Sequence, residues 1–138
     1  MVVLTRDDLN ELYAEAALLV EQYDRSGFKY DSVDTVALDL FERSFGLVVI
    51  GCSLNNNDVH IHARRGHVNG CGIVYVLSDT ETVNLKGFVT KEVAKFAHSL
   101  CDLVIGRVNN GLPDVQNLML PNAIAYAKRT QREVSQHI

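Results

Sequence analysis

Hydrophobic residues recur along this chain at two different spacings, and the change between them divides the chain into three parts. Over residues 5–24, apolar side chains return every three or four positions, which is the spacing of an amphipathic helix. Thr5 followed by Asp8 suits a helix start, because the two side chains can cap the first turn reciprocally. The same spacing predicts a second helix over 32–44, which Gly46 would end.

From residue 47 the spacing shortens to two, which is typical of strands with one buried face. The pattern predicts four strands, over residues 47–54, 58–64, 73–77 and 82–88. Polar or glycine-rich segments separate them, at residues 55–57, 65–72 and 78–81. Short connections favour antiparallel neighbours, so we expect a four-stranded antiparallel meander.

Helical spacing returns after Thr90 and predicts a helix over 91–106. A final helix is expected to begin near Pro121, since proline suits the first helical position, and its apolar residues to stop around Tyr126, before a solvated tail. The predicted architecture is a single compact α+β domain over 1–138. It is helical over 5–44, a sheet over 47–88 and helical again over 90–135.

Composition and charge narrow the function classes. Apolar residues make up 47% of the 138 residues, enough for an ordinary core. The formal charge of −4 argues against a nucleic-acid binder, which needs a basic surface.

No segment approaches the length of a membrane span, and the first residues lack the pattern of a signal peptide, so we expect a cytoplasmic protein. The odd number of cysteines, three, suits free thiols.

The most informative segment for function is the predicted strand over 58–64. Alternation along a strand sends its apolar side chains to one face and Asp58, His60, His62 and Arg64 to the other. The segment that follows adds Arg65, His67 and Asn69 among three glycines.

These seven residues lead to the first hypothesis, that the protein binds a small anionic molecule such as a nucleotide or a sugar phosphate. The histidines and the two arginines would donate to phosphate oxygens, while Asp58 would fix a tautomer or accept from a hydroxyl. The strand face would be the floor of the site, and the following loop would close over it.

Three alternatives remain open. His60 and His62 could hold a zinc ion with Asp58, His67 or Cys71 as third ligand, as in a metal-dependent hydrolase, and Cys71 with His67 could form a thiol nucleophile and its base. The polar strand face could instead be the contact surface of a non-enzymatic interaction or inhibitor module.

A homo-oligomer is also expected. The strand over 47–54 is apolar on both faces and would lie at the edge of the meander, where an exposed edge needs a cover.

Overall fold

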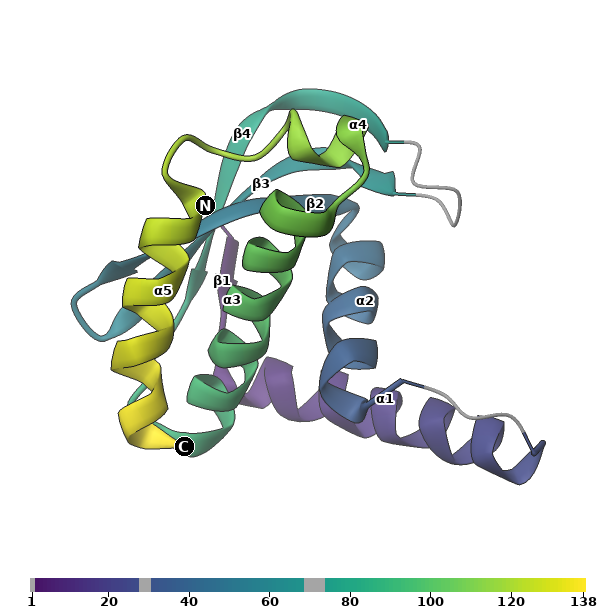
Figure 1. Cartoon of the computed structure of the whole chain (residues 1–138). Helices are drawn as coiled ribbons and strands as arrows, with labels where there is room; N and C mark the ends of the chain where they lie inside the picture. Colours follow the sequence, from purple (N-terminus) through teal and green to yellow (C-terminus); the bar gives the residue numbers. More distant parts are fainter. Residues whose placement is uncertain (1, 28–30, 69–73) are drawn as a thin grey trace.

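The chain forms a layer of helices on one face of a four-stranded sheet (Figure 1). The computed structural model describes residues 2–27, 31–68 and 74–138. In chain order the elements are β1 (Val2–Leu4), α1 (Arg6–Arg25), α2 (Val33–Phe45), β2 (Leu47–Asn55), β3 (Asp58–Val68), β4 (Val74–Leu85), α3 (Lys91–Asn110), α4 (Pro113–Gln116), α5 (Ala123–Val134) and a last 3₁₀ turn (Ser135–His137). The fold class is α+β, as predicted.

The first two helices begin and end where local chemistry places them. Thr5 and Asp8 form the expected capping box, in which the Thr5 backbone N–H donates to the Asp8 carboxylate at 2.8 Å. Ser32 caps α2 by accepting from the backbone N–H of Thr35, and Gly46 ends α2 in the left-handed conformation with φ of 62°. Both predicted helices are confirmed within a residue or two.

The sheet is mixed, which corrects the predicted antiparallel meander. Its strand order is β1-β4-β3-β2, and β2, β3 and β4 are antiparallel neighbours as expected. However, β1 lies parallel to β4, with Val2 opposite Val83 and Leu4 opposite Leu85. Three residues are too few for their spacing to reveal a strand, so β1 depends on a partner far along the chain.

The strands predicted over 73–77 and 82–88 are a single strand, β4. The polar residues 78–81, predicted to form a turn, lie inside it and pair with β3, with Thr80 opposite Arg64 and Glu81 opposite Ala63. The Glu81 carboxylate meets the Arg65 guanidinium at 3.0 Å, so pairing with a charge offsets the weak strand preference of this segment.

The loop predicted over 65–72 begins later than expected, because β3 continues to Val68. A β-bulge between Arg64 and Gly66 shifts the register with β4, and the Gly66 N–H donates to the Gly46 carbonyl at 2.9 Å. The extra residues of this bulge are on β4, where the partners of Arg64 and Gly66 are Thr80 and Val76. Arg65 stays in register with Leu47 of β2, so strand alternation places its side chain on the face opposite that of Arg64.

The core lies between the sheet and the helices. Val59, Ile61 and Ala63 of β3 are fully buried in one cluster that includes residues of α1, α2, α3 and α5. Phe41 of α2 and Phe96 of α3 pack edge to face in this cluster, with ring centroids 5.8 Å apart. The apolar face of β3 therefore seals the core, as its alternation predicts. No helix in the described part of the chain is long and apolar enough to cross a membrane.

Helix α5 is longer than its apolar pattern predicts. It begins at Ala123 and continues to Val134, and Ala127, Thr130 and Val134 are buried along it. The Thr130 hydroxyl donates to the Tyr126 carbonyl at 2.8 Å, which satisfies that buried polar group within the helix. The predicted solvated tail is therefore wrong, because a threonine continues the buried stripe.

Part of the free edge of β2 is covered by the chain itself, which weakens the argument for an oligomer based on that edge. The Val49 N–H donates to Glu42, and the Val49 carbonyl accepts from Arg107 at 3.0 Å. The Ile50 carbonyl accepts from the backbone N–H of Leu120. Two side chains and one loop therefore satisfy three backbone groups of this edge, at Val49 and Ile50.

Candidate functional site

The polar stripe of β3 lies on the sheet face opposite the core. Asp58, His60, His62 and Arg64 are each half-buried and alternate with the fully buried apolar residues of the strand. Their neighbours on β4 are polar as well: Asn84 lies opposite His60, Thr82 opposite His62 and Thr80 opposite Arg64. The predicted grouping of these four side chains on one face is confirmed, and β4 extends it into a hydrogen-bonding surface. We call this surface the open face.

His62 is the most constrained residue of the open face. Its Nε2 lies 2.9 Å from the hydroxyl of Ser53 on β2. Burial lowers the pKa of His62, and the charge of nearby His60 lowers it further. The imidazole is therefore neutral at pH 7, with one ring nitrogen engaged by Ser53.

His60, two residues before His62 on β3, also has a side chain of β2 as a neighbour. The Asn55 side-chain amide lies 2.9 Å from His60 Nε2, where the amide nitrogen donates and the imidazole accepts. Opposite His60, the side-chain oxygen of Asn84 is buried and has no hydrogen-bond partner among the described residues. A buried acceptor of this kind is stabilised when a bound molecule or water donates to it.

A small pocket adjoins His62 where β2 meets the start of α5. It has a volume of about 240 Å³, and its lining includes Ser53, His62, Leu120 and Tyr126. Gly51, opposite His62, makes this arrangement possible: a Cβ there would lie 3.1 Å from the Leu120 Cδ1 atom. The absence of a side chain at Gly51 lets Leu120 form one wall of the pocket.

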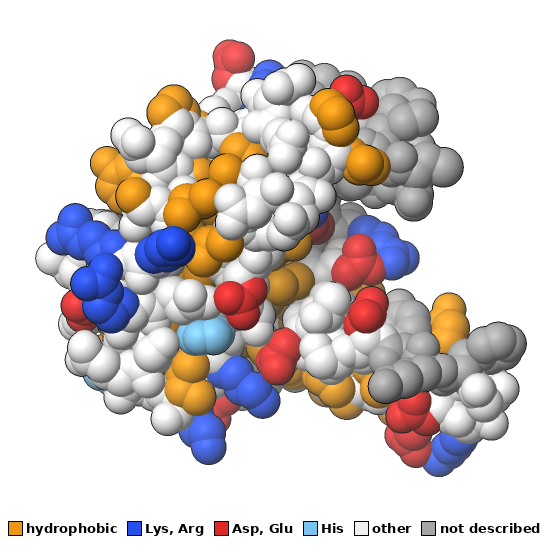
Figure 2. Space-filling view, in the orientation of Figure 1, with side chains coloured by type: hydrophobic (Ala, Val, Ile, Leu, Met, Phe, Trp, Pro, Cys, Tyr) orange, Lys and Arg blue, Asp and Glu red, His pale blue; other side chains and the backbone are white. Residues whose placement is uncertain are grey.

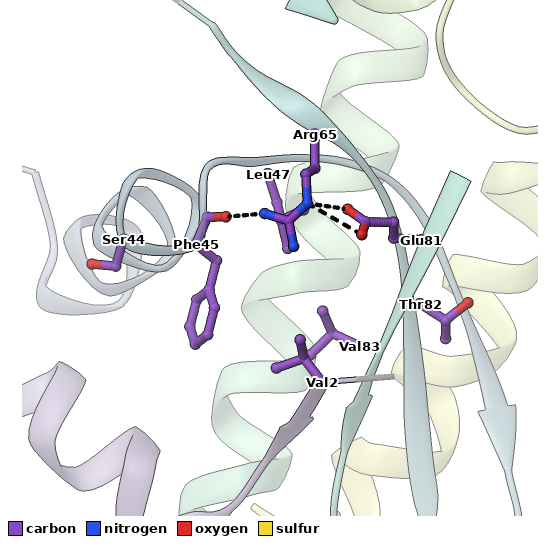
Figure 3. Close-up of a pocket in the computed structure, with 8 residues that line it drawn as sticks. All are labelled: Val2, Ser44, Phe45, Leu47, Arg65, Glu81, Thr82 and Val83. Carbon is purple, nitrogen blue, oxygen red and sulfur yellow. Dashed lines mark hydrogen bonds and ion pairs between the residues drawn. The ribbon is translucent and has the colours of Figure 1, made fainter. Parts of the chain in front are cut away.

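Arg65 does not join the open face. Strand alternation places it on the opposite face, toward the helices, where its guanidinium pairs with Glu81 and donates to the Phe45 carbonyl at 3.4 Å (Figure 3). There it lines an open cleft of about 610 Å³ with Leu47 and Val2. The predicted pairing of Arg64 with Arg65 around one anion is therefore not formed. This larger cleft also carries little free positive charge, because Glu81 offsets the arginine.

The remaining predicted site residues have separate surroundings. One Asp58 carboxylate oxygen accepts from the Gly87 backbone N–H at 3.0 Å, which ties β3 to the end of β4. His67 is exposed, near the end of β3. Asn69 and Cys71 lie outside the described residues, so the structure says nothing about the loop predicted to close the site.

Within residues 2–27, 31–68 and 74–138, no three His, Cys, Asp or Glu side chains group closely enough to hold a metal ion. His60 and His62 instead have Asn55 and Ser53 as neighbours at their Nε2 atoms. The zinc alternative thus gains no ligand set from the described residues.

Cys52 and Cys101 are core residues, as their apolar surroundings predict. Both are buried and free, with their sulfur atoms 3.8 Å apart across the β2–α3 contact. The contact with Cys52, together with burial, raises the pKa of the Cys101 thiol, which disfavours the reactive thiolate.

Sequence reasoning missed the β2 side of the site, formed by Gly51, Ser53 and Asn55. The signal was available, since Ser53 and Asn55 alternate with apolar Cys52 and Leu54 at strand spacing. No sequence signal indicated that the segment before α5 contributes to the site, because a contact between segments so far apart in the chain leaves no local pattern.

Comparison of the chain with protein-family models, curated proteins and solved structures found no match.

Proposed function

We propose that the protein binds a small anionic molecule on the open face of its sheet, with the anionic group near His62 and Arg64. The observation that carries this proposal is the position of His62, which is half-buried between a polar sheet surface and a pocket. Along a strand, residues two apart are about 7 Å apart at the backbone, so His62 and Arg64 can both reach one phosphate or carboxylate group.

The pocket limits the size of the ligand. A volume of about 240 Å³ lies below the usual range for drug-sized ligands, roughly 300–1,000 Å³. Leu120 provides an apolar wall and the exposed Tyr126 a polar rim. These features favour a compact phosphate or carboxylate compound with a small apolar part. A whole nucleotide would have to extend from the pocket over the open face.

Binding of an anion is expected to change the ionisation of His62. The imidazole is neutral because burial disfavours its charge, and a negative group beside it would favour the protonated form. Binding would then take up a proton, and affinity would increase as the pH falls. Sulfate is a suitable probe because it stays doubly charged across the range in which histidine titrates.

The test is a titration with sodium sulfate followed by the imidazole signals in NMR spectra, with sodium chloride at matched ionic strength as reference. Melting temperature is a poor readout here, since sulfate stabilises folded proteins in general. We expect saturable shifts at His60 and His62 and none at His137. The variants His62→Gln and Arg64→Gln should each weaken the response at least about tenfold, the scale of one charged hydrogen bond.

Arg25→Gln is the matched control, because it removes the same charge from the exposed end of α1. It should leave the sulfate response unchanged. Shifts that grow linearly without saturation, or that are equal at all histidines, would overturn the proposal.

A further inference from the structure

The helix side of the molecule carries a basic surface that the net charge of −4 does not predict. Lys128, Arg129 and Arg132 are all exposed on α5. Helical geometry places them within about 100° of one another around the axis, so they form one surface, here called the α5 basic face. No carboxylate among the described residues lies within ion-pair distance of any of the three. Figure 2 shows basic side chains over the part of the surface where α5 lies.

A groove with the opposite charge runs between α2 and α3. It consists of two open cavities, of about 330 and 460 Å³, which share Thr35, Leu38 and Leu103 as lining residues. We call their combined surface the α2–α3 groove. The two shared leucines give it an apolar base, while most of the charged side chains that line it are acidic.

The α2–α3 groove keeps a net negative charge after its internal ion pairs are counted. Two of its carboxylates are matched by arginines, in the pairs Glu42–Arg107 and Asp39–Arg43. The other three, on Asp31, Asp34 and Asp102, have no lysine or arginine partner among the described residues. Asp34 accepts from the neutral Tyr13 hydroxyl at 2.8 Å. Asp102 lies 3.7 Å from His98 Nδ1, and this contact is an ion pair only when the imidazole is protonated.

The two surfaces adjoin. Gln131 of α5 donates to the Asp102 carboxylate at 2.7 Å, so the helix that carries the α5 basic face borders the α2–α3 groove. In Figure 2 the acidic side chains lie over α2 and α3, beside the basic ones over α5. Adjoining surfaces of opposite charge become complementary to themselves when a second copy is turned by 180° about an axis at their boundary.

We propose that the protein forms a two-fold homodimer in which the α5 basic face of each copy contacts the α2–α3 groove of the other. The arrangement brings each set of three basic residues against three carboxylates that, within the described part of the chain, have no lysine or arginine partner. Contacts of this kind are screened by salt, so the dimer should weaken as ionic strength increases. The polar residues of the open face take no part in this contact, since they lie on the sheet face opposite the core.

The test is sedimentation equilibrium of the full chain at low and high salt. We expect a dimer at low salt and a dissociation constant at least about tenfold higher at high salt. The double variant Arg129→Glu/Arg132→Glu should be monomeric. Its matched control, Arg6→Glu/Arg25→Glu on α1, makes the same change in net charge outside both surfaces and should still form dimers.

A charge exchange makes the test specific. The variant Asp31→Arg/Asp102→Arg should also be monomeric, because the groove of one copy then repels the α5 basic face of a second copy. Mixed with Arg129→Glu/Arg132→Glu, it should form a heterodimer in which both contacts are complementary. Circular dichroism of each variant checks that its fold is kept. A wild-type monomer at all concentrations, a dimer insensitive to salt and to these variants, or an assembly larger than a dimer would overturn the proposal.

Discussion

Replacing Arg107 by methionine should be among the most damaging single changes to this fold. The Arg107 guanidinium holds Glu42 through two hydrogen bonds of 2.7 and 2.8 Å and donates to the Val49 carbonyl at 3.0 Å. Glu42 in turn accepts from the Val49 N–H at 2.8 Å. The side chains of Arg107 and Glu42 are only 14% and 13% exposed. Arg107→Met would leave a largely buried carboxylate and a strand-edge carbonyl without their partner.

The expected cost follows from that burial. Removing one partner of a buried ion pair costs about 3–5 kcal/mol, because an uncompensated charge remains. Both side chains keep some contact with solvent, so we expect the lower end, about 3 kcal/mol. The matched control is Arg43→Met, which breaks the pair with Asp39. Those side chains are 68% and 46% exposed, and such pairs contribute about 0–1 kcal/mol.

The assay is urea denaturation followed by circular dichroism, at high salt so that self-association does not contribute. The double variant Glu42→Gln/Arg107→Met should be more stable than Arg107→Met alone, since no unpaired charge is left in it. If Arg107→Met cost no more than Arg43→Met, the stabilisation of the β2 edge by this pair would be refuted. Equal stability of the single and double variants would refute the argument from an unpaired charge.

Three further predictions concern the site and the end of the chain. Gly51→Ala should destabilise the protein by about 1–3 kcal/mol and weaken the sulfate response, because the new methyl group presses on Leu120; denaturation and NMR titration measure the two effects. His62 has a lowered pKa in the folded state, so its contribution to stability should be lost as the pH falls below about 6.5, where the unfolded chain gains the proton first. His62→Gln should reduce the loss of stability between about pH 8 and about pH 5.5, and an unchanged pH profile would contradict this assignment. Val134→Ala should cost roughly 2 kcal/mol in urea denaturation, whereas a solvated tail would show almost no effect.

The sequence predicted what depends on local spacing. Helical periodicity located α1, α2 and α3, and strand alternation placed His60 and His62 opposite the buried face of β3. These predictions hold because the side-chain period belongs to the element itself. The sequence predicts two strands in place of β4, because residues 78–81 resemble a turn. The β3 partners with which this segment pairs, and the Arg65 that meets Glu81, lie on another strand.

The division of the predicted site has a similar cause. Arg64 and Arg65 are neighbours in sequence, and a loop would let both reach one ligand. Strand β3 instead continues through both residues, so alternation sends Arg65 to the helix side, and that continuation depends on pairing with β2 and β4. Likewise, the wall formed by Leu120 depends on a contact with Gly51 that links distant segments. Long-range contacts of this kind decide which polar residues share a site.

The two proposed surfaces can be tested independently because they use different side chains. The ligand would contact the open face at His62, while the dimer would use the α5 basic face and the α2–α3 groove. Arg129→Glu/Arg132→Glu should therefore abolish dimerisation and leave the saturable imidazole shifts unchanged. His62→Gln should do the reverse, weakening the sulfate response in a protein that still dimerises. If either variant removed both properties, the shared element would have to be α5, whose residues Ala123 and Tyr126 line the pocket. The site would then be coupled to assembly through that helix.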